Sequence, residues 1–186
     1  MESLNKLLKL GLIELEIRKL SEKYNFQFVH VSTDCVFEGT SGKYDEASFP
    51  DATSFYGRSK ALGEVKNNRS VTLRTSIVGP DSNPNGIGLF QWFMNQEESV
   101  GGYTKVIWTG VTTIELAKQI EIALINNLTG LNHVVNNDFI SKHDLINLFK
   151  KSFKKNISTE EILAEEYLLE ILDNANEWKE KCLSSK

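Results

Sequence analysis

Segments with the pattern of β-strands alternate along this chain with segments that have the pattern of α-helices. Leucines at helical spacing predict an amphipathic helix over residues 3–23, and the apolar run at 26–32 predicts a buried strand of the parallel type. Further strands are predicted at 71–78, 105–108 and 131–135, and further helices at 54–67, 88–96, 114–126 and 141–154. This order favours an α/β fold with parallel pairing.

The composition of the chain is that of an ordinary globular protein. It has 186 residues, of which 40% are hydrophobic and 25% charged, and its formal net charge is −4. Its one dense basic group fits a solvated helix face better than a nucleic-acid patch, because no aromatic platform accompanies Lys150, Lys151, Lys154 and Lys155. No apolar run approaches the roughly 18 residues that a membrane span needs. We therefore expect neither a nucleic acid nor a membrane as a partner.

The cysteines and histidines indicate neither a disulfide framework nor a metal site. Cys35 and Cys182 fit a reducing compartment, and the N-terminus is interrupted by charge too early for a signal-peptide core. His30, His133 and His143 lie on unrelated elements, and none has a partner at metal-ligand spacing. We expect a cytoplasmic protein without a metal site.

A hydroxyl, a phenol and an ammonium group are predicted to meet near the end of the first strand. Tyr56 and Lys60 are four residues apart, so they share one face of a helix. Thr33 lies at the end of the strand that precedes that helix. Three such groups can move a proton to or from a carbonyl or an alcohol. A Tyr-x-x-x-Lys pair also arises by chance, so a solvated Lys60 and a structural Tyr56 are the alternative interpretation.

Four longer blocks around these residues resemble one known family. They are Ser-Thr-Asp-Cys-Val-Phe-Glu-Gly at 32–39, Gly-Lys-Tyr-Asp-Glu at 42–46, Tyr-Gly-Arg-Ser-Lys-Ala-Leu-Gly-Glu at 56–64 and Leu-Arg-Thr-Ser-Ile-Val-Gly at 73–79. In this order they resemble the extended short-chain dehydrogenase/reductase superfamily, and within it the dTDP-4-dehydrorhamnose reductase type. The resemblance implies the C-terminal half of a Rossmann-type doubly wound parallel sheet, joined to a small α/β substrate-binding portion.

The resemblance also implies a role for each polar residue of the site. Tyr56 would exchange a proton with the sugar C4 oxygen while a nicotinamide supplies hydride. Lys60 would hold the nicotinamide ribose and lower the pKa of Tyr56, because a cation within about 4–6 Å favours tyrosinate. Thr33 would hydrogen-bond the reacting oxygen, unless it only satisfies local backbone groups. Ser32 is the alternative hydroxyl, and it joins Tyr56 and Lys60 among the cofactor-binding candidates.

Three further residues have both a functional and a structural interpretation. Val36 and Phe37 follow the strand end, where the family contacts its sugar substrate, and ordinary core packing explains them equally well. Arg74 starts the loop that lies near the nicotinamide in relatives. For Arg74 itself we predict a structural ion pair.

The Gly-x-Gly-x-x-Gly run that holds a cofactor pyrophosphate does not occur in this sequence. We therefore expect NAD(P)H to make contacts on its nicotinamide side only. By resemblance, about four strands of the nucleotide-binding sheet precede the point at which this chain enters the family pattern. The strand at 26–32 would then lie at a sheet edge, where unpaired backbone groups invite another strand. We expect a homodimer or an N-terminal partner fragment.

These expectations divide the chain into three parts. Residues 1–100 would be the remnant of an NAD(P)-binding domain, 101–157 the substrate-binding portion and 158–186 a divergent helical tail. The expected function is reduction of a nucleotide-linked 4-keto sugar in deoxysugar or polysaccharide synthesis. Two alternatives stay open, a non-catalytic binding or regulatory subunit and an epimerase or dehydratase of the same superfamily. Whether this chain alone is active is open as well.

Overall fold

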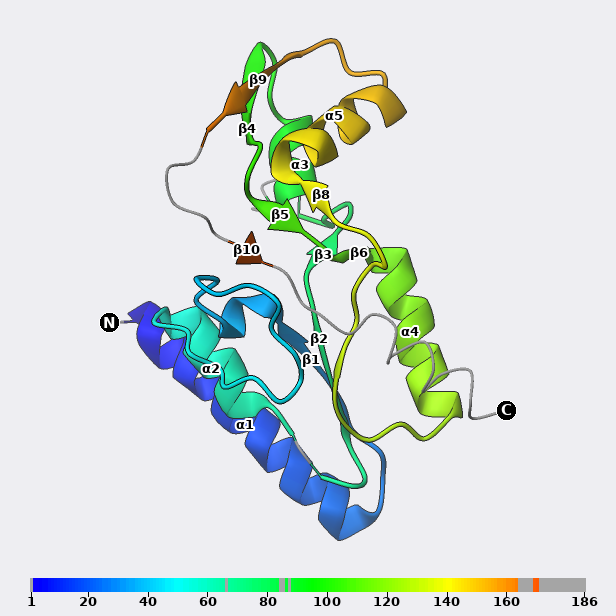
Figure 1. Cartoon of the computed structure of the whole chain (residues 1–186). Coiled ribbons are helices and arrows are strands. Elements are labelled where there is room, and N and C mark those ends of the chain that lie inside the picture. The colour runs from blue at the N-terminus through cyan, green and yellow to red at the C-terminus, as the bar shows by residue number, and fades with distance from the viewer. Residues whose placement is uncertain (1, 66, 84–85, 87, 164–168, 171–186) are drawn as a thin grey trace.

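Three parallel strands form the central sheet of the computed structural model (Figure 1), which describes residues 2–65, 67–83, 86, 88–163 and 169–170. They are β1 (Val29–Thr33), β2 (Val71–Thr75) and β7 (Gly130–His133), in the order β1-β2-β7. Every residue of β2 is buried, because β2 has a strand on each side and helices over both faces. A central parallel sheet of an α/β protein confirms the predicted fold class.

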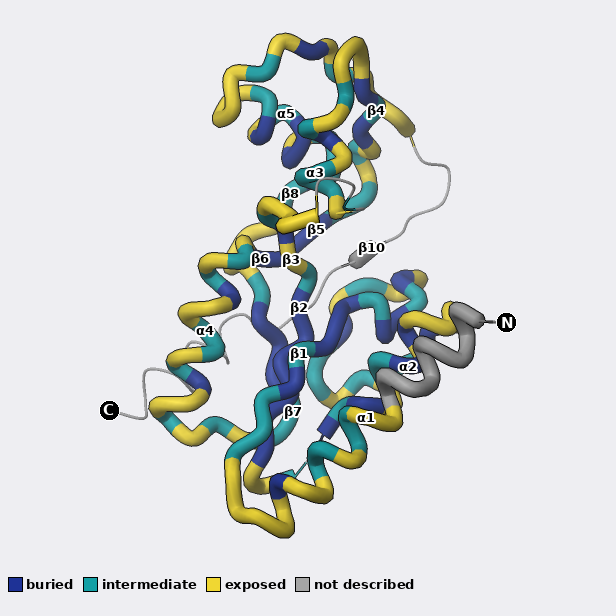
Figure 2. The backbone as a smooth tube through the Cα atoms, turned by 180° about the vertical axis from the view of Figure 1, so that it is seen from behind, coloured by how far each residue is buried: buried dark blue, intermediate teal, exposed yellow. Residues whose placement is uncertain are grey.

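Helices cover both faces of this sheet. On one side α1 (Glu2–Tyr24) lies along α2 (Phe55–Gly63), and on the other side lies α4 (Thr113–Ile125) (Figure 1). Apolar side chains of α4 pack on the sheet in one core cluster, which contains Val71, Leu73, Val111, Leu116, Ala123 and Val134. Figure 2 shows this buried zone running along the strands. The helices thus hold the carboxyl end of β1 in place.

The remaining elements build a smaller layer beyond the carboxyl ends of the central strands (Figure 1). Its strand pairs are β3 (Ile77–Val78) with β6 (Val111–Thr112), β4 (Ser99–Tyr103) with β9 (Ser158–Ile162), and β5 (Ile107–Trp108) with both β8 (Ile140–Ser141) and β10 (Leu169–Glu170). Two helices complete it, α3 (Leu89–Met94) and α5 (Lys142–Ser152). Their apolar faces enclose a second core cluster around Phe93 and Phe149.

Three helices begin directly after a hydroxyl residue that caps them, at or next to the helix starts predicted from the sequence. The hydroxyl of Ser54 accepts a hydrogen bond from a backbone N–H of α2, that of Thr112 does so for α4, and that of Ser141 for α5. Each bond satisfies one of the N–H groups that a helix leaves unpaired at its start. The predicted helix starts are therefore confirmed.

Several predicted boundaries differ from the structure. The helix predicted to reach residue 67 ends at Gly63, and the strand predicted over 71–78 breaks at Ser76, after which β3 pairs in a different sheet. Strand β4 was not predicted, because its two glycines have a turn pattern. The helix predicted for the tail is wrong at Ser158–Ile162, which forms β9 against β4. Residues 164–168 and 171–186 lie outside the described residues.

The predicted division at residue 100 does not separate two sheets. After the smaller layer begins, the chain returns through α4 and adds β7 to the central sheet beside β2. Segments of the central sheet and segments of the smaller layer therefore alternate along the sequence.

Candidate active site

The carboxyl end of β1 places Thr33 at the opening of a short 3-10 helix, η1 (Asp34–Val36). The Thr33 hydroxyl accepts a hydrogen bond from the Cys35 N–H at 3.2 Å and donates one to Asp34 Oδ1 at 3.0 Å. The local backbone role weighed for Thr33 is therefore present. The same hydroxyl lies near the side chain of Tyr56.

Close packing of α2 against η1 brings Tyr56 to Thr33. A Cβ atom at position 57 would lie 2.1 Å from the Cys35 carbonyl oxygen, so only glycine at Gly57 permits this approach. The Thr33 hydroxyl lies near enough to the Tyr56 phenol to affect its pKa, and Tyr56 stays 46% exposed. A phenol beside a strand-end hydroxyl and open to solvent on one side can exchange a proton with a bound ligand.

The pKa of Tyr56 is raised above its ordinary value of 10.0. Burial is the main cause, and the charges of Cys35, Asp34 and Glu14 add to it, whereas the neighbouring Thr33 hydroxyl acts in the opposite direction. The expectation that Lys60 lowers this pKa is wrong in this structure. Tyr56 therefore stays a protonated phenol at neutral pH.

Lys60 lies one turn further along α2, where a carboxylate from α1 binds it. Its Nζ donates to Glu14 Oε1 at 2.9 Å, and each of the two side chains is 18% exposed. The same Glu14 oxygen lies 3.3 Å from Nδ1 of His30, a β1 residue that is 3% exposed. Burial and the Lys60 charge lower the pKa of His30 from 6.5 to about 4, so His30 is neutral at pH 7.

Glu14 and His30 are site residues that the sequence reasoning missed. The contact between Glu14 and Lys60 joins residues that lie 46 positions apart. The leucine spacing of α1 gives no signal for it, because Leu12 and Leu20 of that pattern are exposed. One sequence feature is consistent with the contact of Glu14. Glu14 and Ser21 are seven residues apart, so they lie on the same face of α1, and this face packs against the protein.

Ser32 and Arg74 belong to a buried ionic network. Arg74 donates to both oxygens of Glu64, at 2.6 Å from Nε and 2.7 Å from the second nitrogen, and both side chains are almost fully buried. This confirms the structural ion pair predicted for Arg74. The Ser32 hydroxyl donates to the same carboxylate at 2.9 Å. A contact of Ser32 with cofactor stays a prediction, since its hydroxyl already has this partner.

Val36 and Phe37 pack inside the protein. Both are buried, in a cluster with Tyr44, whose ring stacks on that of Phe37 at a centroid distance of 4.2 Å. The guanidinium of Arg74, which belongs to the ionic network described above, lies 4.9 Å from the centroid of the Phe37 ring. These contacts agree with core packing, and a contact of either residue with substrate stays a prediction.

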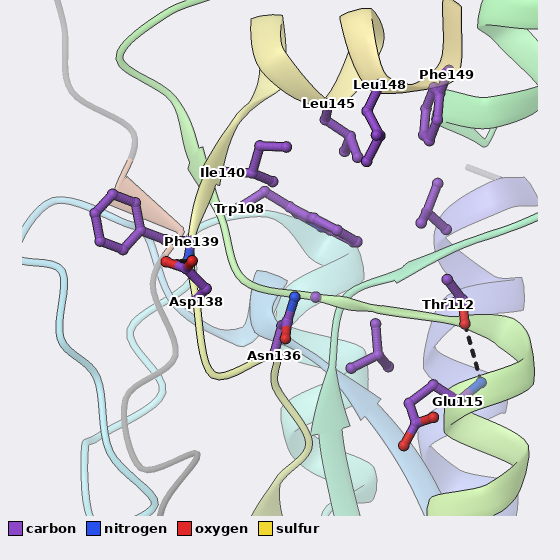
Figure 3. Close-up of a pocket in the computed structure, with 13 residues that line it drawn as sticks. Trp108, Thr112, Glu115, Asn136, Asp138, Phe139, Ile140, Leu145, Leu148 and Phe149 are labelled. Atoms are coloured by element: carbon purple, nitrogen blue, oxygen red, sulfur yellow. Dashed lines mark hydrogen bonds between the residues drawn. The ribbon is translucent and has the colours of Figure 1, made fainter. Parts of the chain in front are cut away.

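A cavity of about 540 Å³ lies in the smaller layer, apart from Thr33, Tyr56 and Lys60 (Figure 3). Apolar side chains of α5 form one wall and polar side chains lie on the opposite side, where the Thr112 hydroxyl caps α4 at Glu115. None of the predicted site residues lines this cavity. Trp108 contributes its ring to the wall and donates from its indole N–H to the Ser76 hydroxyl at 2.8 Å.

No helix in the described part of the chain is both long and apolar enough to cross a membrane. Within the same residues, no group of three or more His, Cys, Asp or Glu side chains is arranged to hold a metal ion.

The parallel α/β sheet, with Thr33 at the carboxyl end of β1 and Tyr56 close to it, has a Rossmann-like reductase fold. The chain belongs to the RmlD substrate binding domain family, whose model matches residues 14–168. The predicted resemblance to the dTDP-4-dehydrorhamnose reductase type is thereby confirmed.

Individual relatives agree with this family. The spore coat polysaccharide biosynthesis protein SpsK of Bacillus subtilis is 26% identical over 152 residues, which cover 79% of this chain and 53% of the relative. A hypothetical dTDP-4-dehydrorhamnose reductase of Sulfolobus tokodaii has a similar structure, with a TM-score of 0.72, 26% identity and coverage of 88% of this chain and 61% of that one.

A third relative is similar in fold. The dTDP-4-dehydrorhamnose reductase of Bacillus anthracis, solved in complex with NADP, has a TM-score of 0.71 at 21% identity, and the match covers 87% of this chain and 65% of that one. This chain thus spans between about half and two thirds of the length of the relatives it matches.

Proposed function

We propose that this chain carries the proton-transfer residues of an NAD(P)-dependent reductase that acts on a nucleotide-linked 4-keto sugar. The observation that supports this most directly is the position of Tyr56 beside Thr33 at the carboxyl end of β1, with Lys60 one helical turn further along α2. Ligands of open α/β sheets bind at this end of the strands. Deoxysugar or polysaccharide synthesis is the corresponding pathway class.

In this proposal Tyr56 is the proton donor. Reduction of a ketone needs a proton at the carbonyl oxygen, and a phenol whose pKa is raised remains protonated at neutral pH to supply it. For Thr33 to bond the reacting oxygen, its hydroxyl proton must turn away from Asp34 Oδ1, to which it donates in this structure. A bound nicotinamide supplies the hydride.

The residues present fit the nicotinamide side of such a cofactor. An ammonium group has three N–H donors, and Glu14 uses one of those on Lys60, so donors are left for ribose hydroxyls. Tyr56 is close to half exposed and therefore within reach of a ligand. Contacts to the pyrophosphate are not part of the proposal for this chain.

The partner proposal concerns the outer edge of β1. Among the described residues β1 pairs with β2 alone, so its other edge presents backbone groups to a further strand. We propose further that a strand from a second copy of the chain, or from an N-terminal fragment of the same family, pairs with this edge of β1. The proposed location of the assembly is the cytoplasm. Sedimentation of the purified chain tests this part, and a monodisperse monomer that gains no partner counts against it.

The test of the proposed activity is turnover with a matched pair of variants. Tyr56→Phe removes the proton donor, whereas Tyr103→Phe removes a hydroxyl of equal exposure on β4, away from the site. Incubated with reduced cofactor and a dTDP-linked 4-keto sugar, the wild type and Tyr103→Phe should oxidise the cofactor, and Tyr56→Phe should lose at least about 100-fold in rate.

The same assay separates the alternative functions. A reductase consumes one reduced cofactor for each sugar, whereas an epimerase or dehydratase regenerates its cofactor and gives no net oxidation. If calorimetry detects no binding of NADH or NADPH to the chain, alone or with its partner, the reductase proposal fails. Binding of the nucleotide sugar without turnover would instead support a non-catalytic binding subunit.

A further inference from the structure

The cavity of about 540 Å³ in the smaller layer has an apolar wall that the fold holds in place (Figure 3). Leu145 and Phe149 of α5 are buried in this wall, and the ring of Trp108 completes it. The indole N–H of Trp108 is bound to Ser76, and a Cβ atom at Gly110 would lie 2.4 Å from a carbon of the same ring. The volume lies within the range of about 300–1,000 Å³ that is typical of small-molecule sites.

Two apolar side chains that line the cavity are exposed to solvent. Leu148 is 50% exposed and Phe139 is 66% exposed. Single exposed apolar side chains are common on protein surfaces, but these two border a space whose wall is itself apolar. An apolar group bound in the cavity would remove both side chains from water, which is favourable in proportion to the area covered.

All charged side chains that line the cavity in the described part of the chain are acidic. They are Glu115, in the first turn of α4, and Asp138, which follows β7. Glu115 already contacts Lys118 at 3.5 Å and Gln119 at 2.8 Å. Asp138 accepts a hydrogen bond from the Phe139 N–H at 2.8 Å, and no cation of the described residues pairs with it. A positively charged ligand would therefore meet a carboxylate that lacks a counter-charge.

The same charges make the cavity unsuitable for phosphates. The N-terminus of a helix usually favours an anion, because its first N–H groups are unpaired. At the start of α4, however, the Thr112 hydroxyl accepts the Glu115 N–H at 3.1 Å, and the carboxylate of Glu115 adds negative charge. The phosphates of a cofactor or a nucleotide sugar would be repelled here. The ligands of the proposed reductase function therefore do not account for this cavity.

We propose that the cavity is a binding site for a small protonated amine that carries an apolar body. The apolar body lies between α5 and the Trp108 ring, and the ammonium group points towards Asp138. Lys142, which does not line the cavity, has its Nζ 6.0 Å from the centroid of the Trp108 ring, so this ring already attracts a cation. The inference does not rest on the proposed reductase function, because none of the residues assigned to that function lines the cavity.

The first test follows the indole N–H signals of the isotope-labelled chain by NMR while phenylbutylamine is added. The signal of Trp108 is identified by its absence from the spectrum of Trp108→Phe. Phenylbutylamine should shift this signal saturably. Phenylpentanoate has the same apolar chain with a carboxylate in place of the ammonium group, and it should bind at least about tenfold more weakly. Added salt should weaken the binding of the amine, because salt screens the charge pair.

Two variants with matched controls test the proposed contacts. Asp138→Asn should weaken phenylbutylamine binding about three- to fivefold, the effect expected of an exposed charge pair. Its control is Asp81→Asn, because Asp81 is also exposed and also accepts a backbone N–H, away from the cavity. Leu148→Lys puts a cation at the cavity and should weaken binding at least about tenfold. Its control is Ile125→Lys, which adds the same charge at an exposed apolar position of α4 outside the lining.

Circular dichroism shows whether each variant is folded, and either Asp138→Asn or Leu148→Lys suffices for the decision. The proposal is overturned if phenylbutylamine leaves the Trp108 signal unchanged, if phenylpentanoate binds as tightly, or if the folded variants bind the amine as their controls do. A Trp108 signal that changes with protein concentration alone would show that a second copy of the chain covers this face, and it would overturn the proposal as well.

Discussion

Acid should destabilise this protein through His30. Its side chain is 3% exposed, and burial together with the Lys60 charge lowers its pKa from 6.5 to about 4. Between these two values the unfolded chain binds a proton that the folded protein does not, so stability falls as the pH falls. The contribution of neutral His30 is complete above pH 6.5 and is lost as the pH drops towards 4.

The size of this loss follows from the two pKa values. A pH of 5 is 1.5 pH units below the pKa of 6.5 that His30 has in the unfolded chain, and it is still above the folded value of about 4. Each pH unit in this window is worth 1.36 kcal/mol, so the free energy of unfolding falls by about 2 kcal/mol relative to neutral pH. This is a large part of the 5–15 kcal/mol that is typical of natural domains.

Urea unfolding, followed by circular dichroism at several values between pH 7 and pH 5, measures the loss. The comparison is with His30→Asn, which keeps an N–H toward Glu14 and does not titrate. Carboxylates and the other histidines contribute equally to both proteins, so the difference between the two slopes isolates His30. Equal losses in the wild type and the variant would refute the reasoning.

Three further outcomes follow from the same structure. Glu64→Gln should lower the free energy of unfolding by about 3–5 kcal/mol in urea titrations, because it leaves the guanidinium of Arg74 buried without its counter-charge. Ser141→Ala should cost about 1 kcal/mol by the same assay through the lost cap of α5, whereas Ser141→Asn should keep most of the stability. Lys60→Met should raise the pKa of His30 measured by NMR, because the competing cation beside Glu14 is gone; an unchanged value would contradict the assignment.

Local features of the site could be predicted from the sequence because they depend on residues close together along the chain. The helix caps at Ser54, Thr112 and Ser141 are contacts within three positions. The spacing of Tyr56 and Lys60 on one helix face is equally local. The strand before Thr33 has an apolar pattern because a central parallel sheet is covered on both faces.

Other features depend on contacts between distant segments. The exposed Leu12 and Leu20 show that helical spacing of leucines does not tell which face of α1 is covered. Strand β9 forms because Ser158–Ile162 finds an edge at β4, although its own sequence has a helical pattern. Pairing with a distant strand overrides such local preferences.

By itself, the sequence determined the α/β class, the family, and the presence of a hydroxyl, a phenol and an ammonium group at one strand end. Only the tertiary structure decided which charges surround that group, because the carboxylate that pairs with Lys60 comes from α1, 46 residues earlier. A pKa depends on every charge and on the burial around a group, whichever part of the chain supplies them. Lys60 was thus expected to lower the pKa of Tyr56, whereas its folded surroundings raise it, mainly through burial.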